Sequence, residues 1–257
     1  MGISYYNSSL SQNRLLTRSI SIIIPAWNEQ VRLPDTLSRV EEYLEQTAWD
    51  FHEIIVVDDG STDGTVAAAM TFANANPNIR VLQNPGNRGK GYSVRHGMLE
   101  AKGEWTLFTD ADLSSPLEEL EKLWSAAQES GAQVAIGSRA LDRSLIGVHQ
   151  PVLRESAGKL FNLAVRAVTG LPFWDTQCGF KLFQTSAARD IFRRQQLERF
   201  GFDVEVLFIA RKLGYHVIEV PVRWNDVAGT KVGTLSGLSA FFDPLRVRIN
   251  QLKGRYR

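Results

Sequence analysis

Short apolar runs alternate with amphipathic stretches between residues 19 and 139, and this alternation restricts the possible fold more than any other feature. Five runs have the β-branched and aromatic composition of buried strands: 20–24, 54–57, 79–82, 105–108 and 134–136. Apolar residues at helical spacing predict five helices, at 34–47, 65–76, 91 to about 101, 116–129 and 202–213. A further strand is expected at 216–222. Because strand and helix alternate, we expect an α/β fold whose mostly parallel sheet has helices on both faces.

Polar or charged residues follow nearly every expected strand. Pro25 is expected to end the first strand. The polar residues are Asn28 and Glu29 after the first strand, Asp58 and Asp59 after the second, Arg88 and Lys90 after the third, Asp110 and Asp112 after the fourth, and Arg139 after the fifth. In open α/β sheets, ligands bind at the edge where the carboxyl ends of the strands meet. We therefore expect a ligand site at this edge.

Asp110 and Asp112 lie on either side of Ala111, where the fourth strand ends. Two carboxylates this close are costly at the end of a buried strand unless a cation or hydrogen-bond donors neutralise them. In a tight turn they can supply oxygen ligands to Mg²⁺ or Mn²⁺, and a phosphate can complete the coordination. The alternative is a loop with two solvated aspartates. The charged groups at the neighbouring strand ends favour the metal site.

Two further loops contain residues that can contact a nucleotide. Asp58 and Asp59 exceed what is needed to cap the following helix, and they can accept hydrogen bonds from ribose hydroxyls or from a base N–H. A plain turn is the alternative. The glycine-rich loop 84–91 carries Arg88 and Lys90 at a helix N-terminus and suits an anion. This loop matches neither the Walker A pattern nor the dinucleotide-binding GxGxxG pattern.

The chain after the fifth strand combines apolar, aromatic and basic residues. Residues 153–169 and 235–252 are expected to form amphipathic helices, the second interrupted at Pro244. Such a helix either packs on the sheet or lies on a membrane surface, since an apolar face with basic residues suits anionic headgroups. The segment 172–183 between them is rich in aromatic residues around Asp175.

The 257 residues are 44% hydrophobic and 22% charged, which is typical of one large globular domain. The single cysteine, Cys178, excludes an intramolecular disulfide and, with no histidine nearby to act as a base, is expected to be buried packing rather than a nucleophile. A net charge of +1 gives no argument for nucleic acid binding. No apolar run approaches the ~18–20 residues that span a bilayer, and residues 1–18 lack the apolar core of a signal peptide. We expect a cytoplasmic protein with, at most, peripheral membrane contact.

Eight sequence blocks together resemble one family. In order they are IIIPAWNE, VVDDGSTDGT, NRGKGYSVRHG, TDADLSSP, GSR, DTQCGFKLF, FDVEVLF and EVPVRW followed by GTK, and they extend from about residue 19 to residue 248. This order resembles glycosyltransferase family 2, which has the GT-A fold, and within it the dolichyl- and polyprenyl-phosphate sugar synthases. DADLSSP and WDTQCGFKLF resemble the β-glucosyltransferase branch. The mannosyl branch usually has glutamine where this chain has Ser114, so the resemblance favours UDP-glucose over GDP-mannose. The N-terminal membrane anchor of dolichyl-phosphate glucosyltransferases has no counterpart here.

The resemblance implies a role for each residue of the donor site. Glu29, Asp58 and Asp59 would hold the base and ribose, Pro25, Ala26 and Ala111 would line the pocket, Lys90 would add charge near the donor, and Asp110 and Asp112 would bind Mg²⁺ or Mn²⁺. The bound metal would bridge the diphosphate and stabilise the departing UDP. The domain division expected from this resemblance is a loose arm at 1–18, a catalytic domain at 19–234 and an amphipathic tail at 235–257. Within the catalytic domain, residues 19–139 would bind the donor and residues 140–234 the acceptor.

The acceptor decides whether the reaction needs a base. A sugar hydroxyl must lose a proton before it attacks, whereas a phosphate monoester with a second pKa near 6 is already ionised at pH 7. A phosphate needs cations that position it, and Arg139, Arg154 and Lys231 are the candidates. We therefore expect direct in-line attack with inversion on a polyprenyl phosphate at the inner membrane face. The alternatives are a GDP-mannose donor, a soluble hydroxyl acceptor with Asp175 as base, and a catalytically silent nucleotide-sugar-binding module.

Overall fold

The computed structural model describes residues 18–148, 152–227 and 242–257, with side chains described throughout except at 152–154. Lys231, the expected arm before Arg18 and the first part of the expected 235–252 helix therefore lie outside the described residues. Arg154 lies in a described helix, but its side chain is outside them.

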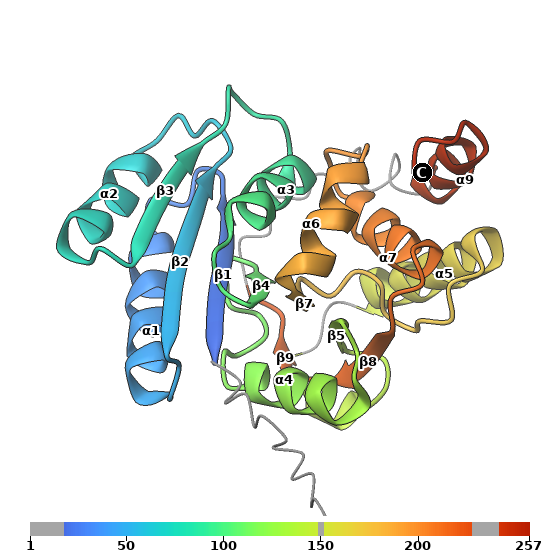
Figure 1. Ribbon diagram of the computed structural model, residues 1–257, viewed down its shortest axis with the longest axis horizontal. Helices are drawn as coiled ribbons and strands as arrows, with labels where there is room; N and C mark the ends of the chain where they lie inside the picture. The colour runs from blue at the N-terminus through green and yellow to red at the C-terminus, as the bar shows by residue number, and fades with distance from the viewer. Residues whose placement is uncertain (1–17, 149–151, 228–241) are drawn as a thin grey trace, which may run out of the picture.

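Seven strands form one mixed sheet (Figure 1). In spatial order they are β3 (Ile79–Gln83), β2 (Phe51–Asp58), β1 (Ser19–Ala26), β4 (Trp105–Thr109), β7 (Phe180–Gln184), β5 (Val134–Ser138) and β8 (Val217–Pro221). All neighbours are parallel except β7, which runs antiparallel to both β4 and β5. The predicted α/β fold with a mostly parallel sheet is confirmed.

Helices cover both faces of this sheet (Figure 1). They are α1 (Leu33–Gln46), α2 (Thr65–Ala75), α3 (Lys90–Glu100), α4 (Glu119–Ser130), α5 (Val152–Thr169), α6 (Thr185–Arg194), α7 (Phe202–Lys212) and α9 (Asp243–Leu252). Ile22 of β1 belongs to a core with α1, α2 and α4, whereas Ile23 belongs to a second core with α3, α5, α6, α7 and α9. A short 3₁₀ helix, η1 (Arg143–Leu145), precedes β6 (Ile146–Val148), which pairs with β9 (Trp224–Asn225).

Several boundaries differ from the sequence prediction, and three of them concern a proline or the start of a helix. β1 continues past Pro25, where only β2 pairs with it, because its pairing with β4 ends at Ile23. A strand tolerates proline where it lacks a partner on one side. Helix α4 begins at Glu119 rather than at residue 116. Pro244 lies in the first turn of α9 and begins this helix rather than interrupting it, since an N–H at that position has no intrahelical partner.

The sequence pattern does not predict β7 or α6. The apolar run of β7 contains Lys181, which is fully buried and forms an ion pair with Asp203 of α7. A buried charge of this kind is tolerated only with a partner, and nothing in the local sequence of β7 supplies one.

Candidate active site

The carboxyl ends of β1, β2, β4 and β5 lie at one edge of the sheet, and their loops carry most of the residues predicted to form the site (Figure 1). The loop after β1 is bonded to the loop after β2. The backbone N–H of Asn28 donates to Ser61 Oγ at 2.9 Å, and that of Glu29 donates to Thr65 Oγ1 at 2.7 Å. The backbone N–H of Asp59 donates to the carbonyl of Ala26 at 2.8 Å. These bonds fix the predicted donor-side loops relative to each other.

Asp58 and Asp59 are both nearly buried, and their carboxylates bind neighbouring loops. Asp58 accepts hydrogen bonds from the backbone N–H groups of Gly60 and Ser61 at 3.1 and 3.2 Å. Asp59 accepts from the side-chain amide of Asn84 and the backbone N–H of Arg88, both at 2.9 Å, and from the backbone N–H of Gly89 at 2.7 Å. Asp58 therefore forms the turn, and Asp59 holds the glycine-rich loop beside it. Their contacts with a base or ribose stay a prediction.

The loop held by Asp59 places Lys90 next to Asp110. Lys90 begins α3, and its Nζ lies 2.5 Å from Asp110 Oδ1. Burial lowers the pKa of Lys90, but the carboxylates of Asp110, Asp203 and Asp112 outweigh this effect and raise it. Lys90 is therefore a firmly protonated cation at the predicted metal-binding turn. Glu29, in contrast, forms an ion pair with Arg32 at 3.2 Å.

Asp110 and Asp112 lie in a tight turn after β4. Leu113 has a positive φ of 46°, and the hydroxyl of Thr36 donates to the carbonyl of Ala111 at 2.5 Å. Asp112 Oδ1 accepts the backbone N–H of Ser114 at 2.9 Å. The side chain of Asp110 is 35% exposed, so its carboxylate is accessible from solvent.

The structure gives a test of whether this turn fits a divalent metal. A Cβ at Gly179 would lie 2.1 Å from Asp110 Oδ2, so only glycine leaves the carboxylate its present position. Within the described residues, no cluster of three or more histidine, cysteine or acidic side chains could hold a metal ion. Mg²⁺ and Mn²⁺ are commonly held by one or two carboxylates, with water and substrate phosphates as the other ligands. Two carboxylates such as Asp110 and Asp112 suit an ion of this kind, and their binding of a metal stays a prediction.

Alanine at Gly179 is expected to weaken Mn²⁺ binding in the presence of UDP by about ten- to a hundredfold, because the added methyl group displaces Asp110. Calorimetric titration of Mn²⁺ measures this effect. Gly158→Ala is the matched control, since nothing lies within 4 Å of a Cβ at that helical position. Unchanged Mn²⁺ affinity in a folded Gly179→Ala protein would contradict the assignment of Asp110 to the metal.

Arg139 and Asp175, both predicted to act at the acceptor, form a bidentate ion pair. Arg139 Nε and Nη2 donate to the two carboxylate oxygens of Asp175 at 2.6 and 2.8 Å, and the backbone N–H of Arg139 donates at 3.0 Å. Asp175 is 2% exposed, whereas the side chain of Arg139 is 25% exposed. Burial raises the pKa of Asp175, but Arg139 outweighs burial and holds the pKa below its ordinary value. A general base works best with a pKa near the operating pH. The lowered pKa of Asp175 and its bonds to Arg139 therefore fit a residue that positions Arg139 better than they fit a base.

A buried ion pair behind this site was not predicted from the sequence. Lys181 Nζ donates to the carbonyl of Cys178 at 2.6 Å and to the carboxylate of Asp203. The same segment contains Gly179, which packs against Asp110. The lysine inside the run FKLF could have indicated this ion pair, since a charge in a buried apolar run requires a partner. Cys178 itself is fully buried, and burial raises the pKa of its thiol to about 11, as expected for a packing residue.

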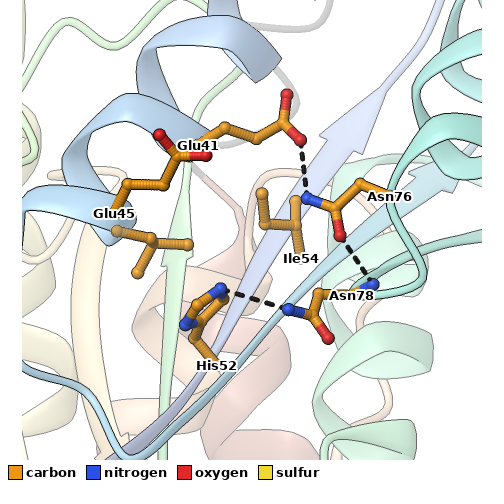
Figure 2. A pocket seen from close by; sticks show the side chains of 7 residues that line it. Glu41, Glu45, His52, Ile54, Asn76 and Asn78 are labelled. Carbon is orange, nitrogen blue, oxygen red and sulfur yellow. Dashed lines mark hydrogen bonds between the residues drawn. The ribbon is translucent and has the colours of Figure 1, made fainter.

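A cavity of about 300 Å³ lies elsewhere, at the amino ends of β2 and β3 (Figure 2). It is lined by Glu41, Leu44, Glu45, His52, Ile54, Asn76 and Asn78. Its polar side chains bind one another: Asn76 Nδ2 donates to Glu41 at 2.7 Å, and Asn78 Nδ2 lies 3.3 Å from His52 Nε2. Because the cavity lies at the opposite edge of the sheet from Asp110, it is separate from the candidate active site.

Comparison with known proteins identifies the family. Residues 21–192 match the family model for glycosyl transferase family 2. The dolichyl-phosphate beta-glucosyltransferase of Drosophila melanogaster is 38% identical over 255 residues, which cover 93% of this chain and 77% of that protein. The protein of the same name from Saccharomyces cerevisiae is 32% identical, with 93% of this chain and 76% of that protein covered.

Solved structures share the fold. The complex of Mycobacterium tuberculosis glucosyl-3-phosphoglycerate synthase with Mn²⁺, UDP-glucose and phosphoglyceric acid superposes with a TM-score of 0.64 at 18% identity, covering 90% of this chain and 79% of that one. Mannosyl-3-phosphoglycerate synthase from Rubrobacter xylanophilus gives a TM-score of 0.67 at 18% identity, covering 94% and 77%. The predicted GT-A fold and the family resemblance are both confirmed. This chain belongs to glycosyltransferase family 2, and it is a hexosyltransferase enzyme.

Proposed function

We propose that this enzyme transfers glucose from UDP-glucose to a polyprenyl or dolichyl phosphate, with inversion at the anomeric carbon and with Mg²⁺ or Mn²⁺ bound. The observation that carries the proposal is the arrangement of Arg139. Its guanidinium is partly exposed near Asp110, and it is held in place by a buried carboxylate with a lowered pKa. Such a site presents a fixed cation to an anionic acceptor.

The relatives and the fold support the choice of donor and acceptor. The named relatives are dolichyl-phosphate beta-glucosyltransferases, and they match most of this chain. The M. tuberculosis structure with the same fold contains Mn²⁺ and UDP-glucose. Ser114 stands where the mannosyl branch usually has glutamine, which favours glucose over mannose.

The proposed mechanism needs no general base. An oxygen of the acceptor phosphate attacks the anomeric carbon, and the bond from that carbon to the diphosphate of UDP breaks. The phosphate is already ionised near pH 7, and Arg139 orients it through charge-assisted hydrogen bonds. Asp110 and Asp112 would hold the metal, which as a Lewis acid offsets the charge on the departing UDP. Lys90, protonated beside Asp110, adds positive charge near the diphosphate.

An apolar, basic surface adjoins the acceptor side. Helices α5 and α9 pack side by side (Figure 1). Their outer faces expose Leu160 and Leu163 at 62% each, Phe242 at 65%, Leu245 at 54% and Leu252 at 86%. Basic residues accompany them on and after α9: Arg246, Arg248, Lys253, Arg255 and Arg257. Within the described residues, no helix is long and apolar enough to cross a bilayer.

One contact supports a lipid acceptor at this surface. Asn162 of α5 accepts a hydrogen bond from Thr176 at 3.3 Å, so α5 packs against the loop that carries Asp175, the partner of Arg139. We propose that the α5–α9 surface rests on the cytoplasmic face of an anionic membrane while the acceptor phosphate reaches Arg139. Apolar side chains and basic residues together suit such an interface.

Glutamate at both Leu160 and Leu163 is expected to reduce binding to anionic vesicles by at least about tenfold. Each leucine loses its contribution to apolar burial, and each new carboxylate is repelled by the headgroups. Vesicle sedimentation at low salt measures this effect, and raised salt is expected to release the wild-type protein. Val31→Glu, which changes a residue that is 87% exposed in the loop between β1 and α1, is the control. Equal sedimentation of the double variant and the wild type would contradict the docking surface.

The proposed function has a direct test. Radiolabelled UDP-glucose and GDP-mannose are each incubated with the enzyme, Mn²⁺ and polyprenyl phosphate, and label is counted in the organic phase. We expect label in the organic phase from UDP-glucose alone. Label from GDP-mannose alone would contradict the donor, and label confined to the aqueous phase with either donor would contradict the lipid acceptor.

A further inference from the structure

Glu219 of the edge strand β8 binds three donors with its two carboxylate oxygens. Oε1 accepts from the hydroxyl of Ser138 at 2.7 Å and from the backbone N–H of Asp175 at 2.8 Å. Oε2 accepts from the backbone N–H of Trp174 at 2.9 Å. Ser138 ends β5, and β8 pairs with β5 alone in the sheet. Glu219 thus ties the end of β5 to the loop that carries Asp175.

The loop held by Glu219 in turn holds Arg139. The Asp175 carboxylate accepts three hydrogen bonds from Arg139 and a fourth from the backbone N–H of Gln177 at 3.1 Å. Glu219 therefore fixes the backbone of Asp175, and Asp175 fixes the guanidinium of Arg139. Since charge-assisted hydrogen bonds are roughly twice as strong as neutral ones, this series of contacts restricts Arg139 closely.

Glu219 also holds the backbone of Trp174, the residue before Asp175 in the chain. Trp174 is 55% exposed, and its ring lies 3.9 Å from the guanidinium carbon of Arg166 on α5. One carboxylate therefore holds the backbone of both residues, of which Asp175 binds Arg139 and Trp174 carries an exposed aromatic ring beside Arg166 of α5. A polyprenyl phosphate likewise joins a charged group, the phosphate, to an apolar chain.

We propose that Glu219 is a positioning residue for the acceptor, which holds Arg139 for the phosphate and Trp174 for the first apolar units of the attached chain. The inference rests on the proposed function, because it assumes an acceptor phosphate at Arg139. A purely structural role for Glu219, in closing the edge of the sheet, would affect donor and acceptor binding alike.

Three variants divide the contacts of Glu219. Glu219→Ala removes all of its bonds. Glu219→Gln keeps the shape but turns an NH₂ group toward a backbone N–H or the Ser138 hydroxyl. Ser138→Ala removes one donor and leaves the backbone of Trp174 and Asp175 held. Glu129→Gln, an exposed glutamate at the end of α4, is the matched control.

The measurements are KM and kcat for polyprenyl phosphate, the Kd of UDP with Mn²⁺, and the melting temperature. We expect the KM for polyprenyl phosphate to rise about tenfold or more in Glu219→Ala and about three- to tenfold in Glu219→Gln, since hydrogen bonds to a charged group are lost. It is expected to rise less than about threefold in Ser138→Ala, which keeps both backbone bonds. The Kd of UDP is expected to stay within about twofold throughout, because the hydrogen bonds of Glu219 within the described residues go to Ser138, Trp174 and Asp175, not to predicted donor-binding residues.

A double variant distinguishes positioning from simple stabilisation. In an Arg139→Ala background, Glu219→Gln is expected to raise the acceptor KM much less than it does in the wild type, because the two residues act through one contact. Equal weakening of UDP and acceptor binding by Glu219→Gln, or full additivity with Arg139→Ala, would overturn the inference. If Arg139→Ala alone leaves the acceptor KM unchanged, the proposed function fails instead.

Discussion

Alanine at Asp112 is expected to reduce sugar transfer by more than about a thousandfold, because a bound metal contributes several kcal/mol of charge stabilisation to the leaving group. The fold is expected to stay intact. The carboxylate of Asp112 accepts one hydrogen bond, from the backbone N–H of Ser114 two residues further on, and the turn also has the bond from Thr36 to Ala111. Steady-state transfer from UDP-glucose, with the melting temperature measured alongside, separates the loss of chemistry from the loss of structure.

Asp110→Ala is expected to cause a similar loss through the same ion. This variant also removes the partner of Lys90, so its effect includes an uncompensated cation, and Asp112→Ala is the cleaner experiment. EDTA is expected to abolish the activity of the wild type, and Mg²⁺ or Mn²⁺ to restore it. Asp142→Ala is the control, since among the described residues the carboxylate of this exposed aspartate accepts its hydrogen bonds from Ser144 of η1. Full turnover by Asp112→Ala would contradict the metal assignment.

The position of the site could be predicted because it follows from chain direction. Parallel strands bring their carboxyl ends to one edge, so the residues after β1, β2, β4 and β5 gather there whichever strands are neighbours. The contact between Lys90 and Asp110 is an example, since it joins the loop after β3 to the loop after β4. A pattern of short apolar runs is sufficient for this inference.

The order of strands could not be predicted in the same way. β7 enters the sheet between β4 and β5 and runs antiparallel to both, although it follows them in the chain. Its buried Lys181 forms an ion pair with Asp203, which is 22 residues later and on another element. Local periodicity contains no information about a partner at that separation, so neither β7 nor its buried ion pair was foreseen.

The roles of Asp58 and Asp59 show a second limit. The sequence left open whether they bind a ligand or form a turn, and the structure shows backbone N–H groups bonded to both carboxylates. A carboxylate can organise a loop and still accept a bond from a ligand, because each oxygen has more than one acceptor position. The loop bonds therefore leave their predicted role in donor binding in place as a prediction.

Alanine at Arg139 is expected to lower kcat/KM for polyprenyl phosphate by about ten- to a hundredfold, since a hydrogen bond to a charged group contributes roughly 1.5–3 kcal/mol. The Kd of UDP is expected to change little. Asp175→Asn tests the competing reading, in which Asp175 is the base for a soluble hydroxyl acceptor. Loss of a general base would typically lower the rate by ~10²–10⁴-fold.

The structure changes what Asp175→Asn can show. Asp175 is 2% exposed and accepts both N–H groups of the Arg139 fork, so asparagine removes the charge that holds Arg139. Breaking a buried pair costs about 3–5 kcal/mol of stability, and partial exposure of Arg139 is expected to reduce this loss. Asp175→Asn is therefore expected to lower the melting temperature and to impair transfer moderately through a misplaced Arg139. The loss of rate alone cannot separate the two readings.

The dependence of the rate on pH separates them. The folded-state pKa of Asp175 is lowered, so its contribution to stability is present above the unfolded pKa of about 3.9 and is lost only as pH falls through the folded value. Asp175 therefore stays ionised throughout pH 5–8.

With a phosphate acceptor, the rate is expected to fall as pH drops through about 6, following the second ionisation of the acceptor. The same inflection is expected in Asp175→Asn, because the titrating group belongs to the substrate. Three results together would favour a hydroxyl acceptor over a phosphate acceptor. They are an inactive Asp175→Asn enzyme, a nearly normal Arg139→Ala enzyme and a rate that does not follow the pKa of the acceptor.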